Sequence, residues 1–184
     1  MIIRDTVAGD ITAITEIYAD AVLNDTASFE LHPPSPEEML ARFEAIKSRG
    51  CPYLVATEGS RILGYAYASA YRERPAYRWT VENSVYLTPN ARGRGIGSAL
   101  TSEVIRHCKV LGFRQMIAVI GGKEHTSSIR MHAKLGFEHA GTLEATGFKH
   151  GKWLASVLMQ KSLGEGETTS PDANRFPGTL YRVN

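Results

Sequence analysis

The fold is decided by the stretch Val81-Glu82-Asn83-Ser84-Val85-Tyr86-Leu87-Thr88-Pro89-Asn90-Ala91-Arg92-Gly93-Arg94-Gly95-Ile96-Gly97-Ser98. Its first residues include β-branched, aromatic and apolar side chains, as expected of a strand. The strand ends before Pro89, whose nitrogen cannot donate a backbone hydrogen bond. Three glycines at alternate positions follow, and a helix is then indicated by apolar residues at helical spacing: Ile96, Leu100, Val104, Cys108 and Leu111. The stretch therefore predicts a strand, a glycine turn and a helix in succession.

The glycine turn has the features of an anion-binding site. Glycines let backbone N–H groups converge on a ligand without a Cβ in the way. A helix N-terminus carries partial positive charge and unpaired donors, and Arg92 and Arg94 add two full charges beside it. A phosphate or pyrophosphate is the expected ligand, held by Arg92, Gly93, Arg94, Gly95, Ile96, Gly97 and Ser98.

The other elements follow a mixed α/β order around this unit. Strands are expected at 2–7, 53–57, 61–70, 115–120, 137–148 and 152–162. Helices are expected after a cap at Asp10, after Ser35 with Pro36 in its first turn, and after a cap at Thr126 or Ser127. We expect one domain over residues 1–163, followed at 164–184 by a polar tail that is mobile or laid over a surface.

Composition excludes several classes of partner. The net charge is only +2, and no basic run is interleaved with aromatic residues, so we expect no nucleic-acid partner. No apolar run reaches the ~18 residues of a spanning helix, and the first residues do not resemble a signal peptide. Cys51 and Cys108 lack metal-ligand spacing. We therefore expect a cytoplasmic protein with no membrane partner and no metal.

Four motifs, in order along the chain, resemble the GNAT superfamily of acyl-CoA-dependent N-acetyltransferases. Arg92-x-x-Gly95-x-Gly97 after a strand resembles its pyrophosphate motif, and Ser128-Ile129-x-x-His132-x-Lys134-x-Gly136-Phe137 resembles its next helix. Two further motifs are similar to the phosphinothricin acetyltransferase group, which includes the enzymes that acetylate methionine sulfone and methionine sulfoximine: Thr80-Val81-Glu82-x-Ser84-Val85-Tyr86 and Lys149-x-Gly151-x-Trp153. The resemblance implies the GNAT fold, a central mixed twisted sheet of about six to seven strands flanked by helices.

The resemblance also implies a set of cofactor contacts. Acetyl-CoA would be the donor and coenzyme A the product, with no metal. The backbone of Val85, Tyr86 and Leu87 would hold the acetyl group and upper pantetheine, and the glycine turn would hold the pyrophosphate. Ser128 and Lys134 would flank the lower part of the cofactor. His125, at a position where this group usually carries Asn, is also expected to contact the cofactor. A homodimer with the acceptor pocket near the subunit interface is implied as well.

The expected reaction is direct acetyl transfer to the primary amine of a small amino acid or analogue. Such an amine is largely ammonium at pH 7, and Glu82 is the candidate base that accepts its proton. Arg72 or Arg74 would grip the acceptor's carboxylate. The residues expected to bind the acceptor are Phe29, Arg72, Glu73, Arg74, Glu82, Asn83 and Ser84.

The same residues bear on three alternative functions, of which two stay open and one is disfavoured. The acceptor could instead be a protein or peptide amine, although an aromatic, arginine-rich loop at 71–80 favours an enclosed pocket. A non-catalytic acyl-CoA sensor is kept open by His125 and by Ala155, where relatives commonly have Asp. A Rossmann-type nucleotide enzyme is disfavoured, because Gly93-x-Gly95-x-Gly97 has the wrong spacing for it.

Overall fold

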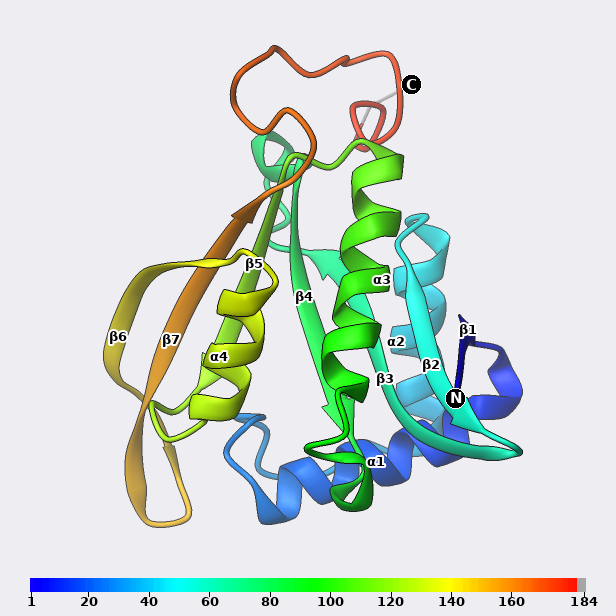
Figure 1. The fold of residues 1–184 in the computed structure, drawn as a ribbon, viewed down its shortest axis with the longest axis vertical. Coiled ribbons are helices and arrows are strands. Elements are labelled where there is room, and N and C mark those ends of the chain that lie inside the picture. The colour runs from blue at the N-terminus through cyan, green and yellow to red at the C-terminus, as the bar shows by residue number, and fades with distance from the viewer. Residues whose placement is uncertain (182–184) are drawn as a thin grey trace.

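A seven-stranded sheet in the order β1-β2-β3-β4-β5-β7-β6 forms the centre of the protein, as the computed structural model of residues 1–181 shows (Figure 1). The strands are β1 (Ile2–Asp5), β2 (Tyr53–Glu58), β3 (Arg61–Ala70), β4 (Thr80–Leu87), β5 (Gln115–Gly121), β6 (Glu138–Lys149) and β7 (Lys152–Ser162). The helices are α1 (Ile11–Asn24), α2 (Pro36–Ser48), α3 (Ile96–Leu111) and α4 (Thr126–Lys134), with short 3-10 turns η1 (Ala8–Asp10), η2 (Pro75–Tyr77) and η3 (Pro89–Ala91). The predicted fold class is confirmed.

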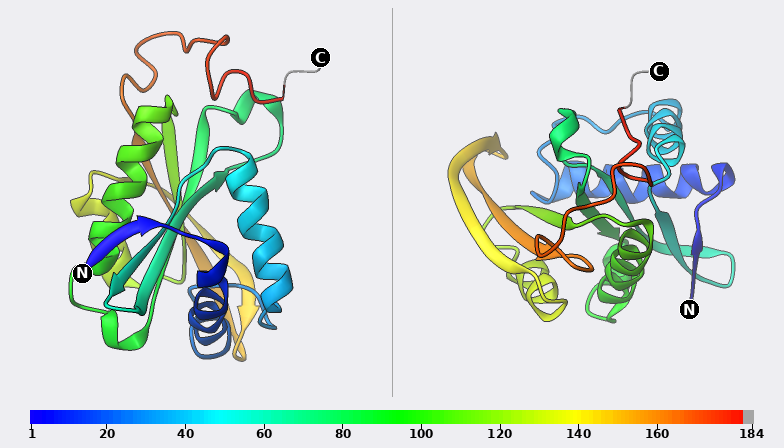
Figure 2. Two further views of the ribbon diagram at one scale, coloured as in Figure 1. Left: turned by 90° about the vertical axis from the view of Figure 1, so that its right-hand side faces the viewer. Right: turned by 90° about the horizontal axis from the view of Figure 1, so that it is seen from above.

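The helices cover the sheet in two layers. Viewed from above, α1 and α2 lie on one face and α3 and α4 on the other (Figure 2). One apolar core forms between the sheet and α3, with Leu100 and Val104 completely buried. A second core forms under α1 and α2, around Ile14 and Val55. Burial on both faces explains why the central strands read as nearly continuous apolar runs.

Alternation along β4 sorts its side chains between the two layers. Val81, Val85 and Leu87 belong to the core beneath α3. Tyr86 points the other way, and its ring meets that of Tyr18 on α1 edge-on at 5.0 Å between centroids. Glu82, four residues earlier, lies on the same face as Tyr86.

The neighbours β4 and β5 are parallel, whereas every other adjacent pair in the sheet is antiparallel. Their pairing ends at Asn83 opposite Ala118, although β4 continues to Leu87 and β5 to Gly121. Beyond that point the two strands diverge toward α1 (Figure 1). Backbone groups on the facing edges of both strands are left without a partner strand, and buried groups of this kind require another partner.

The structure corrects two of the three predicted helix caps. Ser35 does cap α2, since its Oγ accepts a hydrogen bond from the Glu38 N–H at 3.2 Å. Asp10 holds the N-cap position of α1 as predicted, but its carboxylate makes no cap bond to that helix. It accepts hydrogen bonds from the Arg4 guanidinium at 2.7 and 2.8 Å, which lowers the pKa of Asp10. At α4 the N-cap position is His125, and Thr126 is already the first helical residue. At Asp10, an ion pair with a residue six positions earlier takes the place of the cap bond.

The described part of the tail, residues 164–181, crosses the C-terminal end of α3, at the top of Figure 1. Phe176 packs edge-on against Phe113, with 5.6 Å between ring centroids. Pro177 is fully buried. This segment therefore lies against the core in spite of its polar composition.

The α2 cap supports a stability prediction. Ser35→Ala removes the acceptor for the Glu38 N–H, so we expect the free energy of unfolding to fall by about 1 kcal/mol. Urea denaturation measures the change. Ser60→Ala, at an exposed turn position between β2 and β3, is the control and should change stability by less than half as much.

Candidate active site

A cavity of about 630 Å³ opens where β4 and β5 diverge. Its walls come from β4, the turn into α3, the end of β5 and α4, with the end of α1 at the rim. Of the residues expected to bind the cofactor, those that line it are Val85, Tyr86, Leu87, Arg92, Gly93, Gly95, Ile96, Gly97, Ser98, His125, Ser128 and Lys134. The structure thus brings together residues that lie up to 49 positions apart in the sequence.

The glycine turn presents its backbone to this cavity. Gly93 and Gly95 adopt positive φ of 74° and 79°, a region that other residues rarely enter. Gly95 holds the N-cap position of α3, and no side chain caps that helix. The N–H groups of its first turn, together with the helix dipole, are therefore available to an anion.

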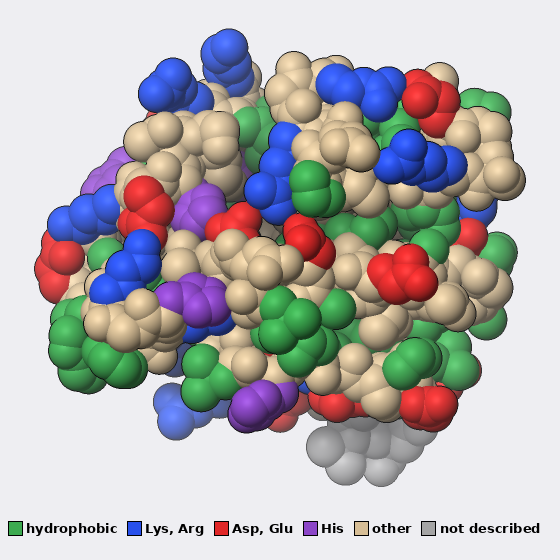
Figure 3. Space-filling view, turned by 90° about the horizontal axis from the view of Figure 1, so that it is seen from below, with side chains coloured by type: hydrophobic (Ala, Val, Ile, Leu, Met, Phe, Trp, Pro, Cys, Tyr) green, Lys and Arg blue, Asp and Glu red, His purple; other side chains and the backbone are tan. Residues whose placement is uncertain are grey.

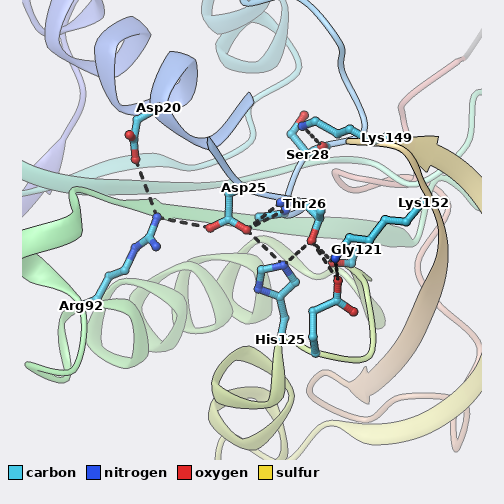
Figure 4. Close-up of polar contacts among 11 residues, drawn as sticks. Asp20, Asp25, Thr26, Ser28, Arg92, Gly121, His125, Lys149 and Lys152 are labelled. Atoms are coloured by element: carbon cyan, nitrogen blue, oxygen red, sulfur yellow. Dashed lines mark hydrogen bonds and ion pairs between the residues drawn. The ribbon is translucent and has the colours of Figure 1, made fainter. Parts of the chain in front are cut away.

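Three side chains at the rim connect the walls of the cavity, as Figure 4 shows. Asp25, just beyond α1, lies 3.4 Å from the Arg92 guanidinium and 3.1 Å from Nε2 of His125. The same nitrogen of His125 lies 2.8 Å from Oγ1 of Thr26. Asp25 is thus the common partner of a residue in the glycine turn and a residue at the start of α4. Sequence reasoning missed it, because nothing near Asp25 signals contacts about 70 and 100 residues away.

Arg94 is the one expected cofactor residue that the structure does not bring to the cavity. Its guanidinium points to β2, where it donates a hydrogen bond to the Glu58 carboxylate at 2.8 Å. The two arginines of the turn therefore face different surroundings, which a sequence pattern alone cannot distinguish.

A buried polar chain joins β4 to α4 at the cavity wall. Nδ2 of Asn83 lies 3.2 Å from Nε2 of His132, whose Nδ1 lies 2.9 Å from the Ser128 carbonyl oxygen. Burial lowers the pKa of His132, so its ring is neutral at pH 7. With Nδ1–H donating to Ser128, Nε2 accepts from Asn83. The Asn83 Oδ1 is buried without a protein partner, which leaves an acceptor at the cavity wall for a ligand donor.

His132 was not among the residues expected to bind the cofactor, since a histidine on a helix more often packs or caps. The signal available was its place four residues after Ser128, in the motif that resembles the pantetheine helix. That spacing puts both side chains on one face of α4.

Glu82 lies on the opposite face of β4 from Asn83, toward α1 and α2. Its side chain is partly buried, and desolvation raises the pKa of the carboxyl. Tyr67, on the neighbouring strand β3, is close enough for the Glu82 charge to raise the pKa of the Tyr67 hydroxyl further, although burial is the main cause. A carboxylate in such surroundings is a stronger proton acceptor than one in water.

The other residues expected to bind the acceptor lie at separate places on this face. Phe29 covers the end of β5, since a Cβ on Gly121 would lie 2.8 Å from its ring. Ser84 lines the cavity from β4. The Arg72 guanidinium lies over the rings of Tyr71 and Tyr77 at 5.3 and 6.0 Å. Glu73 pairs with Arg49 at 3.5 Å, and Arg74 precedes η2. The 71–79 loop thus lies beyond the start of β4, while the cofactor cavity lies at its end.

Acidic, basic and histidine side chains are interspersed at the end where β4 and β5 finish, without one sign of charge dominating (Figure 3). Within residues 1–181 there is no group of three His, Cys, Asp or Glu side chains placed to hold a metal ion. No helix in that range is long and apolar enough to cross a bilayer.

Residues 14–137 match the sequence profile of the acetyltransferase (GNAT) family, which is about two thirds of the chain. The chain belongs to the GNAT acetyltransferase family. Among curated relatives, this GNAT protein is 47% identical to a phosphinothricin N-acetyltransferase of Alcaligenes faecalis, over 93% of this chain and 85% of that one. It is 37% identical to the L-methionine sulfoximine/L-methionine sulfone acetyltransferase of Salmonella typhimurium, over 94% and 99% of the two chains.

A solved structure gives the same result. The GNAT phosphinothricin acetyltransferase of Sinorhizobium meliloti, in complex with acetyl-CoA, superposes with a TM-score of 0.96 at 55% identity, covering 99% of this chain and 98% of that one. The predicted family and the predicted cofactor, acetyl-CoA, are confirmed. The residues that bind it stay predictions, since their support here is the cavity geometry.

The two arginines of the glycine turn provide a matched test of the cofactor site. Arg92→Gln removes a charge that lines the cavity, so we expect the KM for acetyl-CoA to rise roughly tenfold, as for the loss of a charge-assisted contact. Arg94→Gln removes a charge of the same sign two residues away that pairs with Glu58, and should change this KM less than twofold. Steady-state kinetics at a saturating acceptor concentration measure the KM for acetyl-CoA in each variant. Equal effects of the two substitutions would contradict the assignment.

Proposed function

We propose that this GNAT enzyme transfers the acetyl group of acetyl-CoA to the primary amine of a small amino acid or analogue of the phosphinothricin, methionine sulfoximine or methionine sulfone type. The observation that carries the proposal is the arrangement along β4. A partly buried carboxylate, Glu82, faces one layer, and a cavity suited to acetyl-CoA opens at the end of the same strand. The names of the relatives at 47% and 37% identity support the acceptor class.

The proposed reaction is a direct attack in a ternary complex. Glu82 takes a proton from the acceptor's ammonium group, directly or through a water. The neutral nitrogen then attacks the thioester carbonyl carbon and the C–S bond breaks. The nitrogen loses its second proton as the amide forms, and coenzyme A leaves as a thiolate that takes up one proton, which balances the step. No acyl-enzyme is required, since the two cysteines are buried and burial raises the pKa of Cys51 to about 11, far from a reactive thiolate.

Backbone groups are the proposed source of transition-state stabilisation. Val85, Tyr86 and Leu87 lie on the part of β4 that has no partner on the β5 side. An N–H from this segment, aimed at the thioester oxygen, is worth about 3 kcal/mol as the negative charge develops. Donors fixed in a sheet are already oriented, so they need no rearrangement when the reaction occurs.

We also propose a homodimer. Within residues 1–181, the half of the sheet formed by β5, β7 and β6 has no helix on the face that α1 and α2 occupy elsewhere (Figure 2). There Leu143 leaves 51% of its surface exposed, and Val119, which also lines the cavity, leaves 40%. A second copy would cover these side chains beside the acceptor face. Light scattering should give twice the mass of one chain, and a monomer at micromolar concentration would contradict this.

A cytoplasmic location is proposed on two grounds. Acetyl-CoA is a cofactor of intracellular metabolism, and Cys51 and Cys108 are both free thiols.

Glu82→Gln tests the proposed function directly. Wild-type enzyme should release free thiol from acetyl-CoA with phosphinothricin or methionine sulfoximine as acceptor. In Glu82→Gln, kcat/KM for the acceptor should fall roughly 10²–10⁴-fold, because the amide cannot accept a proton. The difference in kcat/KM between wild type and Glu82→Gln should become smaller toward acidic pH, because the wild-type carboxyl becomes protonated. No thiol release by the wild type with any amino acid would reject the function.

The stability of the same variant is its control. Because the pKa of Glu82 is raised by burial, the ionised carboxylate destabilises the folded state above that pKa, and the cost disappears below its ordinary pKa of about 4. We therefore expect Glu82→Gln to unfold at the same or higher denaturant concentration than wild type at pH 7, with the difference vanishing near pH 4. A less stable variant at pH 7 would show that its inactivity reflects misfolding.

A further inference from the structure

The C-terminal tail makes a series of contacts with one loop, 71–79, that joins β3 to β4. Gly178 is buried against the Trp79 ring so closely that a Cβ added to it would lie 2.6 Å from the ring. Pro177, beside it, is fully buried, and Phe176 packs on Phe113. The turn at 176–178 is therefore seated in the fold and ends directly at the loop.

Anchors on both sides hold the tail in this place. Before the turn, the Arg114 guanidinium donates to Oγ1 of Thr169 at 3.0 Å and to the Gly166 carbonyl oxygen at 3.4 Å. The backbone N–H of Arg114 in turn donates to the Trp79 carbonyl oxygen at 2.8 Å. Arg114 is thus a direct link from the tail to the last residue of the loop.

After the turn, the chain reaches the side chains of the loop itself. Leu180 and Tyr181 enclose, with Arg72 and Tyr77, a void of only about 10 Å³, so these groups are packed together. The Arg49 guanidinium lies 3.5 Å from the Tyr181 hydroxyl and 3.5 Å from the Glu73 carboxylate. The tail therefore lies against the residues on which the orientation of the Arg72 guanidinium depends.

The loop has little backbone support of its own. Its internal hydrogen bonds are the local ones of η2, from Tyr77 N–H to Arg74 O at 2.9 Å and from Arg78 N–H to Pro75 O at 3.2 Å. The side chains of Arg72, Glu73 and Arg74 lie at the surface. A segment with few buried contacts of this kind opens easily unless neighbouring segments hold it.

We propose that the 164–181 tail is part of the acceptor site, as a strap that holds the 71–79 loop in the conformation that binds the acceptor's carboxylate. The proposal rests on the proposed function, because it takes the acceptor to be an amino acid whose carboxylate meets Arg72 or Arg74. Phe176 and Gly178 act through the loop, so they are positioning residues and not catalytic ones. The expected ligand of the loop is a carboxylate on a small amine-bearing molecule.

Phe176→Ala is the test variant, with Thr179→Ala, at an exposed tail position, as its matched control. Hydrogen exchange of the 71–79 backbone should accelerate in Phe176→Ala, while exchange of the 92–98 turn stays as in the wild type. The KM for the acceptor should rise roughly tenfold, since small misplacements of a binding group have effects of this size. In Phe176→Ala the KM for acetyl-CoA should change less than twofold. Thr179→Ala should change neither the KM for the acceptor nor the KM for acetyl-CoA.

Phe176→Leu keeps the variant series interpretable if the alanine variant folds poorly. Leucine retains an apolar side chain against Phe113 and should restore most of the loop's protection and the acceptor KM. Unchanged exchange in 71–79 in both variants would overturn the strap. Faster exchange with an unchanged acceptor KM would overturn its role in acceptor binding. A similar rise in both KM values together with a fall in kcat would also overturn the proposal, since that pattern indicates general destabilisation.

Failure of the proposal and failure of the proposed function are distinguishable. The function is judged on the wild type alone, by whether any amino acid supports thiol release. The strap is judged on the difference between Phe176→Ala and wild type in hydrogen exchange, which requires no turnover.

Discussion

The structure depends on the parallel pair β4 and β5 separating after Asn83 and Ala118. Parallel strands that stayed paired to Leu87 would fill the centre of the sheet and leave no room for a ligand. Their separation leaves backbone donors and acceptors of both strands facing the cavity without a partner strand. A long, flexible cofactor with amides along its length is the kind of molecule that can satisfy such groups. The unpaired backbone groups of β4 and β5 thus connect the topology of the sheet with the resemblance of this chain to enzymes that use acetyl-CoA.

Charge at the site is compensated locally, which explains why the net charge of +2 reveals little. Arg92 faces the cavity, but Asp25 lies 3.4 Å from it and also holds His125. A carboxylate placed between an arginine and a histidine links both walls of the cavity. An incoming pyrophosphate would replace Asp25 as the partner of Arg92, aided by the N–H groups of α3. Preorganisation of this kind reduces the cost of binding, because the arginine is already ordered.

Local signals predicted most of the fold, and long-range contacts account for what was missed. The strand, turn and helix of 81–98 were predicted correctly, because strand, proline, glycines and helix are each specified by their own residues. Ser35 behaved as predicted, since its partner is three positions away. Asp10 did not, because Arg4 competes for its carboxylate. Asp25 and His132 gained their roles from contacts across the cavity, and Arg94 lost its expected role to Glu58. None of these partners can be identified without the fold.

The proposed placement of both substrates along one strand would explain why a polar tail is retained against the body of the protein. β4 begins at the 71–79 loop and ends at the glycine turn, so the proposed acceptor and donor regions are connected by eight residues of strand. The glycine turn is fixed by α3, whose buried face includes Ile96 and Leu100. The 71–79 loop has no helix of comparable length following it, only the single turn η2. Precise alignment of an amine with a thioester requires both ends to be held, and the buried turn at Phe176 to Gly178 supplies at the acceptor end what α3 supplies at the other.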